Sequence, residues 1–224
     1  MGKVVYKIQR LPNSLIQKFK GSATGDLSDA LGKVGNMDYK MKLIYPGISL
    51  VGSAITVFCP VGDNLTIHKA IEVAQAGGVL VVNSGGYINA GLFGEIMSLA
   101  CYHKGITGLV IEGACRDSKK IREISFPVFS YGINPGGTVK VSFGSINIPI
   151  QCAGVLVNPG DIVVGDDDGV VVVPKEKVED VLKKVKAKEE KIRVLLATGK
   201  STMEIYGFDN ILKEKGVIQW VKKI

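Results

Sequence analysis

The chain has 224 residues, a formal net charge of +7 and 46% hydrophobic residues. This length and composition suit one large domain, or two small ones, with a sizeable core. No apolar run is long enough to cross a bilayer, and the first residues lack a signal-peptide pattern. We therefore expect a cytoplasmic protein without a membrane partner.

The positive charge raises the question of nucleic-acid binding. Between Lys175 and Arg193, however, eight basic residues are mixed with five acidic ones. Glu179 and Lys183 have the spacing of partners on one helix face. Aromatic residues that could stack on bases do not interleave with the basic ones. The pattern indicates a solvated helix face, and we expect no nucleic-acid partner.

The four cysteines show no Cys-x-x-Cys spacing, so neither a zinc ribbon nor a redox dithiol is indicated. They are best interpreted as reduced and mostly buried thiols. Cys115 precedes Arg116, and a positive charge next to a thiol lowers its pKa, so a reactive Cys115 is one alternative. The simpler interpretation of Cys115 is a small packing residue.

The first half of the chain alternates between helical and extended patterns. Asp26 is a candidate N-cap and Gly32 a candidate C-cap of one short helix. Gly85 and Gly86 predict a flexible loop after a buried strand of the parallel type. The predicted helices cover residues 11–20, 26–31, 64–76 and 94–103. The predicted strands cover residues 52–58, 79–82 and 108–111.

The middle of the chain is richer in extended patterns, and the last part is helical. A helix with an apolar stripe is predicted from Lys175, and an apolar tail around Trp220 is expected to dock on the chain itself or on another subunit. These features predict a single α/β domain over residues 1–224 with a mixed, layered sheet and a C-terminal helical extension from about 175. The extended segments cover residues 126–129, 139–141, 148–150, 154–157, 161–164 and 170–173.

The segment from Gly94 to Met97 is the first candidate site. A glycine at a helix start needs no function by itself. The alternative is that the N–H groups of Gly94, Glu95, Ile96 and Met97 hold a ligand carboxylate, which the helix dipole favours. Glu95 is either a first-turn acid stabilised by that dipole or a base that orients water beside a metal.

Arg116 and Asp117 form the second candidate site, because they follow the predicted strand 108–111. Between strand and site lie the small residues Gly113 and Ala114, which we expect to let a ligand approach. Ligands of open α/β sheets bind outside the carboxyl ends of strands. Arg116 can neutralise charge on a substrate oxygen, and Asp117 can hold Mg²⁺ or Mn²⁺. The alternative is a surface ion pair of little consequence.

Two further groups are weighed as metal sites. Asp166, Asp167 and Asp168 are acidic enough to bind a cation, but a turn between two valine-rich strands explains them more simply. His68 and His103 have no partner at ligand spacing, so neither is interpreted as a zinc ligand or a catalytic base.

With these residues in view, the chain resembles the RraA-like family, which includes 4-hydroxy-4-methyl-2-oxoglutarate aldolases and regulators of ribonuclease E activity. The resemblance runs from about Gly25 to Pro174 and rests on several separate blocks in the same order. These blocks are Gly25-Asp-Leu-Ser-Asp-Ala-Leu31, Gly52-Ser-Ala-Ile-Thr56, Phe93-Gly-Glu95, Gly105 to Asp117, Phe126-Pro-Val-Phe129, Pro159-Gly-Asp-Ile-Val163 and Asp166 to Pro174.

The resemblance implies a layered β/β/α fold of the swivelling type and a homotrimer, or a hexamer of paired trimers, with sites between subunits. It implies that residues 94–97 bind a pyruvyl carboxylate, that Arg116 contacts the keto or enolate oxygen, and that Asp117 binds the divalent cation. Glu95 completes an acidic-x20-Arg-Asp motif. The family often has an acidic residue three positions after the aspartate, where this chain has Lys120, with Glu123 further on.

The function expected from residues and resemblance together is metal-dependent cleavage of a 4-hydroxy-2-oxo acid to pyruvate, with oxaloacetate decarboxylation as a side reaction. The alternative is a non-catalytic regulator that binds a ribonuclease or another protein. A third possibility is another enzyme activity on the same scaffold, acting on a sugar acid or a phosphorylated substrate.

Overall fold

The computed structural model describes residues 2–216, apart from the side chains of residues 186–191. The predicted apolar tail around Trp220 lies outside these residues. The chain forms two compact units, Met1–Leu182 and Lys183–Ile224. Among the described residues, no helix combines the length and the apolar character that a bilayer-spanning segment requires.

The first unit is built on a mixed sheet, which confirms the predicted fold class. Its four central strands pair in parallel in the order β5-β4-β3-β2, and the flanking strands pair antiparallel. In spatial order the strands are β1 (Lys42–Leu43), β5 (Val128–Ile133), β4 (Gly108–Cys115), β3 (Gly78–Phe93), β2 (Leu50–Phe58), β9 (Ile162–Asp166) and β10 (Gly169–Val173), with β6 (Ser145–Ile146) also pairing with β2.

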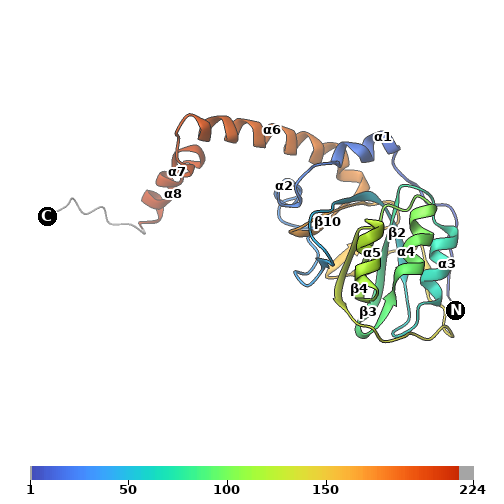
Figure 1. Ribbon diagram of the computed structural model, residues 1–224. Coiled ribbons are helices and arrows are strands. Elements are labelled where there is room, and N and C mark those ends of the chain that lie inside the picture. Colours follow the sequence, from blue (N-terminus) through green and yellow to red (C-terminus); the bar gives the residue numbers. More distant parts are fainter. Residues whose placement is uncertain (1, 217–224) are drawn as a thin grey trace. The chain divides into compact units, whose positions relative to one another are not determined.

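One face of this sheet is covered by helices. Figure 1 shows α3 (Leu65–Val73), α4 (Glu95–His103) and α5 (Ser118–Ile124) over the central strands. Their buried residues join every second residue of the strands in one apolar cluster, as the two-residue period of a strand requires. This cluster includes Val57, Val82 and Ile111 from the sheet and Ile67, Ala70, Met97, Cys101 and Ile121 from the helices.

The other face of the sheet is covered by a two-stranded ribbon, β7 (Ile150–Cys152) and β8 (Val155–Val157). The intervening strand residues, such as Ala54 and Val81, pack there with Ile150 and Val157. Both faces of the central strands are therefore buried, as their continuous apolar runs indicate. The layers are β, β and α, in agreement with the expected β/β/α arrangement.

Both predicted N-terminal helices are present, but their boundaries differ from prediction. The predicted helix 11–20 is α1 (Asn13–Ile16) continued by η1 (Gln17–Phe19). The next helix, α2, covers Thr24–Ala30 with Ala23 as its N-cap, so the assignment of Asp26 as N-cap was wrong. The physical reason is that Asp166 accepts hydrogen bonds from the Thr24 backbone N–H and hydroxyl, at 2.8 and 2.7 Å.

The predicted loop at Gly85 and Gly86 is also wrong, because β3 continues to Phe93. Both glycines have a positive φ, 67° and 69°, which an L side chain rarely adopts. The register with β4 shifts between Asn83 and Tyr87, so the two glycines form an irregularity within the ladder. This extension matters because it brings β3 to the same edge as the end of β4.

The segment 139–141, predicted as extended from its alternation, is not a strand. Val139 makes an isolated bridge with Asp63. The backbone N–H groups of Val141 and Ser142 donate to a carboxylate instead of a strand neighbour. A side-chain acceptor has replaced a ladder here, which the alternating pattern could not reveal.

The helix predicted from Lys175 is present, and two short helices follow it. η2 (Lys175–Lys177) leads into α6 (Val178–Ala197), where Val178 and Val181 are buried while Leu196 is 44% exposed. α7 (Thr202–Tyr206) begins with a capping box in which Ser201 and Glu204 satisfy each other's backbone N–H groups. α8 (Phe208–Lys215) follows directly after Gly207.

A buried carboxylate, Asp63, connects the start of α3 to the 139–142 segment. Its Oδ1 accepts the Leu65 N–H at 2.8 Å, and its Oδ2 accepts those of Val141 and Ser142 at 2.7 Å each. Burial alone would raise the pKa of Asp63. The three backbone donors and the nearby Lys140 charge outweigh burial, and the pKa lies below its usual value.

We expect Asp63→Asn to lower the free energy of unfolding at pH 7 by about 2 kcal/mol, because an amide nitrogen would face backbone donors. Since the folded-state pKa is lowered, the stabilisation by the carboxylate is complete above its ordinary pKa of 3.8 and is lost as the pH falls through the folded value. Denaturant unfolding should show a larger difference between variant and wild type at pH 7 than at pH 3, because pH 3 lies below the ordinary pKa of the carboxyl. Equal stability at pH 7 would contradict this role.

Candidate active site

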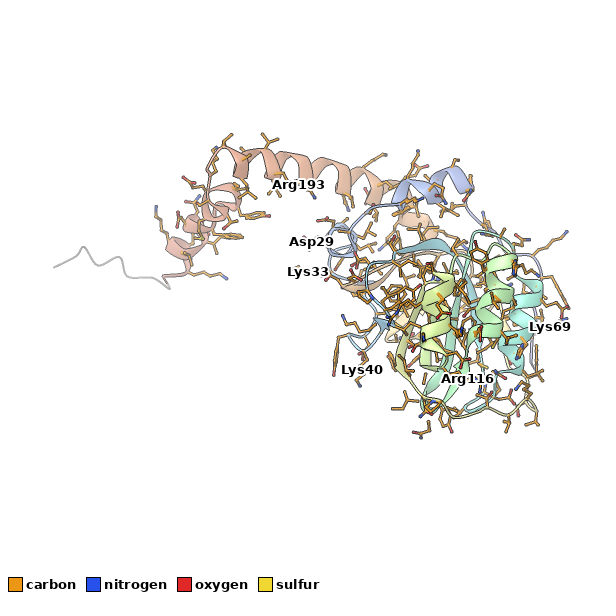
Figure 2. The ribbon with its side chains drawn as sticks, in the orientation of Figure 1. Asp29, Lys33, Lys40, Lys69, Arg116 and Arg193 are labelled. Carbon is orange, nitrogen blue, oxygen red and sulfur yellow. The ribbon has the colours of Figure 1, made fainter. Side chains whose placement is uncertain are left out.

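The carboxyl ends of β3 and β4 meet at one edge of the sheet. Phe93 is paired with Cys115, and the Arg116 N–H donates to the Phe93 carbonyl at 2.8 Å. Gly94 and Arg116 therefore leave their strands side by side, although 21 residues lie between them in the sequence. Figure 2 shows the labelled Arg116 at this edge, where β3 and β4 end.

Gly94 is required here for space and not for its backbone conformation. Its φ of −150° is open to any residue. A Cβ at this position, however, would lie 2.5 Å from Asp117 Oδ2 and 3.1 Å from Arg116 Cγ. Gly91 has the same role earlier in β3, since its Cβ would lie 2.6 Å from Arg116 Cβ. The two glycines let the Arg116-Asp117 pair pack against the end of β3.

Asp117 is the N-cap residue of α5, and its carboxylate lies at the N-terminus of α4. Its Oδ2 accepts the Glu95 N–H at 3.2 Å and lies 3.6 Å from Arg116 Nε. Its backbone is left-handed, with φ 58°, a conformation that aspartate tolerates better than most residues. One of the first-turn donors of the helix is thus already bound to a carboxylate. The N–H groups of Ile96 and Met97 remain as the other first-turn donors, because helical geometry gives them no partner within α4.

These groups share one cavity of about 130 Å³. It is smaller than the ~300–1,000 Å³ of pockets for drug-sized ligands, so it suits a small molecule. Arg116 and Lys140 contribute two positive charges and Asp117 one negative charge. The balance favours an anionic ligand. The residues that line the cavity are Asn64, His68, Gly91, Leu92, Gly94, Ile96, Met97, Arg116, Asp117 and Lys140.

The structure thus brings together the predicted Gly94, Ile96, Met97, Arg116 and Asp117. Glu95 takes part through its backbone N–H, but its side chain is not among the lining groups. That side chain lies near Lys120 of α5, whose pKa is raised first by Glu123 and further by the Glu95 charge. The predicted role of Glu95 as a base remains a prediction.

Gly113 and Ala114 do not open the site to a ligand, contrary to what their small size indicated. Both are buried within β4, and a Cβ on Gly113 would lie 2.4 Å from the Ser84 hydroxyl. The absence of a side chain at Gly113 serves the packing of β4 against β3. The glycines that open the site are Gly91 and Gly94 on the neighbouring strand.

Three lining residues with polar side chains were not predicted as site residues: Asn64, His68 and Lys140. Asn64 and His68 are four residues apart, so they lie on the same face at the start of α3. Partial burial lowers the pKa of His68, and the charge of Lys140 lowers it further. Lys140 lies next to Val141 and Ser142, which Asp63 binds. The i, i+4 spacing of Asn64 and His68 is the signal in the sequence that places both on one helix face. The position of Lys140 depends on a long-range contact that the sequence does not show.

The cysteines are structural thiols. All four are free and buried, which confirms the prediction. The possible lowered pKa of Cys115 is wrong, because burial raises the pKa more than its hydrogen bond with Ser130 lowers it. Its neighbour Arg116 points its charge to the cavity, away from the core that holds the sulfur.

The aspartate cluster 166–168 forms the turn that was predicted between β9 and β10. Its carboxylates are used in structural hydrogen bonds, Asp166 with Thr24 and Asp167 with the Gly47 N–H. Among the side chains that the structure describes, no group of three or more His, Cys, Asp or Glu residues could enclose a metal ion.

A divalent cation nevertheless fits the oxygen of Asp117. Within the described part of the chain, Oδ1 of this carboxylate makes no hydrogen bond or ion pair, while Oδ2 is bound to α4 and Arg116. A single hard oxygen ligand suits Mg²⁺ or Mn²⁺, because Mg²⁺ keeps several waters and accepts ligands from a substrate.

Comparison with known proteins gives the context of this site. The model of the RraA-like family, described as Aldolase/RraA, matches residues 24–172. A protein of Halalkalibacterium halodurans named "Putative 4-hydroxy-4-methyl-2-oxoglutarate aldolase" is 37% identical over 174 residues, which are 78% of this chain and 83% of that protein.

Solved structures agree with the sequence match. An uncharacterized protein from Pseudomonas syringae pv. tomato has a TM-score of 0.76 and 27% identity, with 91% of this chain and 97% of that chain covered. The RNA-processing inhibitor RraA from Thermus thermophilis has a TM-score of 0.63 and 29% identity, with 68% and 93% covered. The chain therefore belongs to the RraA-like family, whose fold it shares.

Proposed function

We propose that this protein is a divalent-metal-dependent lyase that cleaves a 4-hydroxy-2-oxo acid, of the 4-hydroxy-4-methyl-2-oxoglutarate type, to pyruvate and a second carbonyl compound. The observation that carries the proposal is one small cavity shared by Arg116, Asp117 and the first turn of α4. The aldolase name of the Halalkalibacterium halodurans relative supports the same reaction class.

The cavity offers a binding site for the carboxylate of a 2-oxo acid. The free N–H groups of Ile96 and Met97 are hydrogen-bond donors, and the positive end of the α4 dipole favours an anion. Arg116 adds a planar fork of donors that suits two oxygens at once. Its side chain is 46% exposed, so it can reach a ligand without leaving its contact with Asp117.

The proposed reaction breaks the C3–C4 bond of the substrate. The electron pair moves to the 2-oxo oxygen as an enolate, and the C4 hydroxyl gives up its proton to solvent as the second carbonyl forms. C3 then takes a proton from water to give pyruvate. Arg116 stabilises the negative oxygen, which is where electrostatic catalysis contributes most. Mg²⁺ or Mn²⁺ held by Asp117 would supply Lewis-acid polarisation of the same oxygen.

The same enolate forms when oxaloacetate loses CO₂, so we include oxaloacetate decarboxylation in the proposal. We also propose a homotrimer or hexamer, in agreement with the expectation from the family. Ile96 is 74% exposed at the rim of the cavity, which fits a surface that a neighbouring subunit covers.

The first test is pyruvate release from 4-hydroxy-2-oxo acids with added Mg²⁺ or Mn²⁺, which EDTA should abolish. Asp117→Asn should lose at least ~100-fold in kcat/KM, because a neutral amide binds the cation poorly. Asparagine tolerates the left-handed backbone and can still accept the Glu95 N–H, so the fold should be kept. Asp117→Ala should be inactive as well. Full activity in Asp117→Asn would remove the proposed metal ligand.

Arg116→Lys tests the need for a planar donor fork. The charge is kept while the paired donors are lost, so we expect kcat to fall by ~10²–10³ with a smaller change in KM. Thermal unfolding of the variant should match the wild type, because Arg116 is half-exposed. Wild-type kcat in this variant would show that a point charge is enough.

Gly94→Ala tests the close approach of β3 to the Arg116-Asp117 pair. The new Cβ would have to displace Asp117 Oδ2, so pyruvate release should fall by at least ~10-fold. Gly25→Ala is the matched control, because nothing lies within 4 Å of a Cβ at that helical position. It should keep full activity and equal or greater stability. Similar activity in both variants would contradict the proposed crowding.

A second function is a regulator that binds an RNA-degrading enzyme. The Thermus thermophilis structure, described as an RNA-processing inhibitor, supports it. The two proposals separate in a single preparation: stoichiometric capture of a ribonuclease without pyruvate release favours the regulator. Pyruvate release that depends on Asp117 favours the lyase.

A further inference from the structure

A second cavity lies at the other end of β3 from the candidate active site. Its walls come from the N-terminal segment, with Arg10 and Asn13, and from residues 75–77, which directly precede β3. Among the described residues, the two cavities have no lining residue in common. The volume of about 380 Å³ lies within the ~300–1,000 Å³ range of small-molecule sites, so a metabolite fits. The proposed reaction does not use this cavity.

The guanidinium of Arg10 is held in the wall of this second cavity. Its Nη1 donates to the Ala76 carbonyl at 3.0 Å and to Gln75 Oε1 at 3.3 Å. Within the described residues Nη2 makes no hydrogen bond, and unlike Nε it keeps accessible surface. Nη2 lies 3.4 Å from the point that a Cβ on Gly77 would occupy, and Asn13 Oδ1 lies 3.9 Å from that point. The free side of the guanidinium therefore faces open space that a ligand can reach.

The charge of Arg10 has no counter-charge in the described part of the chain. No Asp or Glu side chain described there forms an ion pair with it, and none lines the second cavity. Burial lowers the pKa of Arg10, and no carboxylate acts to raise it. The guanidinium nevertheless stays charged, as arginine does in proteins. A partly desolvated charge without a partner costs free energy, which favours a bound anion.

The other polar side chains of the second cavity also leave donors free. Gln75 Oε1 is occupied by Arg10. Asn13 Oδ1 accepts from Gln17 Nε2 at 3.4 Å. The amide nitrogens of Gln75 and Asn13 make no hydrogen bond within the described residues, and the Ala76 carbonyl is already bound to Arg10. The side-chain groups without a partner are thus all donors, which suits a ligand that only accepts hydrogen bonds.

We propose that this second cavity binds an oxyanion, the phosphate or carboxylate group of a small metabolite, through Arg10 Nη2. Both groups present charged oxygens to such a donor, and a charge-assisted hydrogen bond is about twice as strong as a neutral one. The bound anion supplies the counter-charge that Arg10 lacks. It also links the N-terminal segment to the turn before β3, so it stabilises the fold. The site is separate from Arg116 and does not depend on the proposed lyase reaction.

Calorimetric titration of the full chain with inorganic phosphate and with succinate tests the site, with chloride keeping the ionic strength constant. Wild type should bind at least one of the two saturably, and the tighter anion identifies the group that the cavity takes. Arg10→Gln should weaken that binding at least ~10-fold, because both the charge and the Nη2 donor are lost. Binding of neither anion by wild type would overturn the proposal.

Two variants that lose the same charge elsewhere are the matched controls. Arg122→Gln alters an exposed arginine beside the Tyr45 ring, outside both cavities, and it should bind the anion as wild type does. Arg116→Gln alters the candidate active site, and the binding that depends on Arg10 should remain. Equal weakening in Arg10→Gln and Arg122→Gln would show attraction by net charge alone and overturn the proposal. Loss in Arg116→Gln, with binding kept in Arg10→Gln, would place the anion in the candidate active site and also overturn it.

A crystal of the wild-type protein decides the case in which Arg10→Gln does not fold, since Arg10 also holds Gln75 and Ala76. Selenate is a tetrahedral oxyanion whose selenium scatters anomalously. A soaked crystal should give a selenium peak within hydrogen-bond distance of Arg10 Nη2. A peak near Arg116 and none near Arg10 would overturn the proposal. A peak near Arg10 without any saturable binding in solution would mean an adventitious ion only, and would overturn it as well.

Discussion

The site depends on the close parallel pairing of two strand ends. β3 and β4 meet at Phe93 and Cys115, and the next residues leave the sheet together. This approach is possible because Gly91 and Gly94 have no side chain where Arg116 and Asp117 pack. The packed sheet below fixes the position of both strands, so the charged pair and the first turn of α4 are held before any ligand arrives. Preorganisation of this kind reduces the cost of binding and reaction.

The two walls of the cavity are held by different means. One wall is rigid because it continues the sheet and the start of α4. The other consists of Asn64 and His68 from α3 and Lys140 from a segment without strand neighbours. Asp63 connects these elements through backbone donors on both sides. The charge of this single buried carboxylate thus supports the geometry of the whole second wall.

Much of the fold could be predicted because its signals are local. Continuous apolar runs identified the central strands, and glycines marked the ends of several helices, whereas the one predicted N-cap, Asp26, was wrong. The errors came from long-range contacts: Asp166 sets the start of α2, and Asp63 replaces a strand partner for Val141. The second half of β3 was missed since Gly85 and Gly86 were interpreted as a loop and not as an irregularity within a ladder.

The residues of the candidate site also divide into those placed by local signals and those placed by long-range contacts. Gly94, Arg116 and Asp117 could be placed together because parallel strands end at one edge. Lys140 could not, because its position follows from the hydrogen bond that its neighbour Val141 makes with Asp63, 78 positions away from Val141. The spacing of Asn64 and His68 was visible, but a helix face alone does not show what lies opposite.

The left-handed Asp117 has a consequence for how this cavity can change. Its carboxylate is held at a fixed point by its own backbone, by α4 and by Arg116, so this end of the cavity has little room for sequence variation. Lys140 lies on an exposed segment, where substitution disturbs no core packing. Redesign of the cavity for a different small ligand is therefore best begun at position 140, with the strand-end residues left intact.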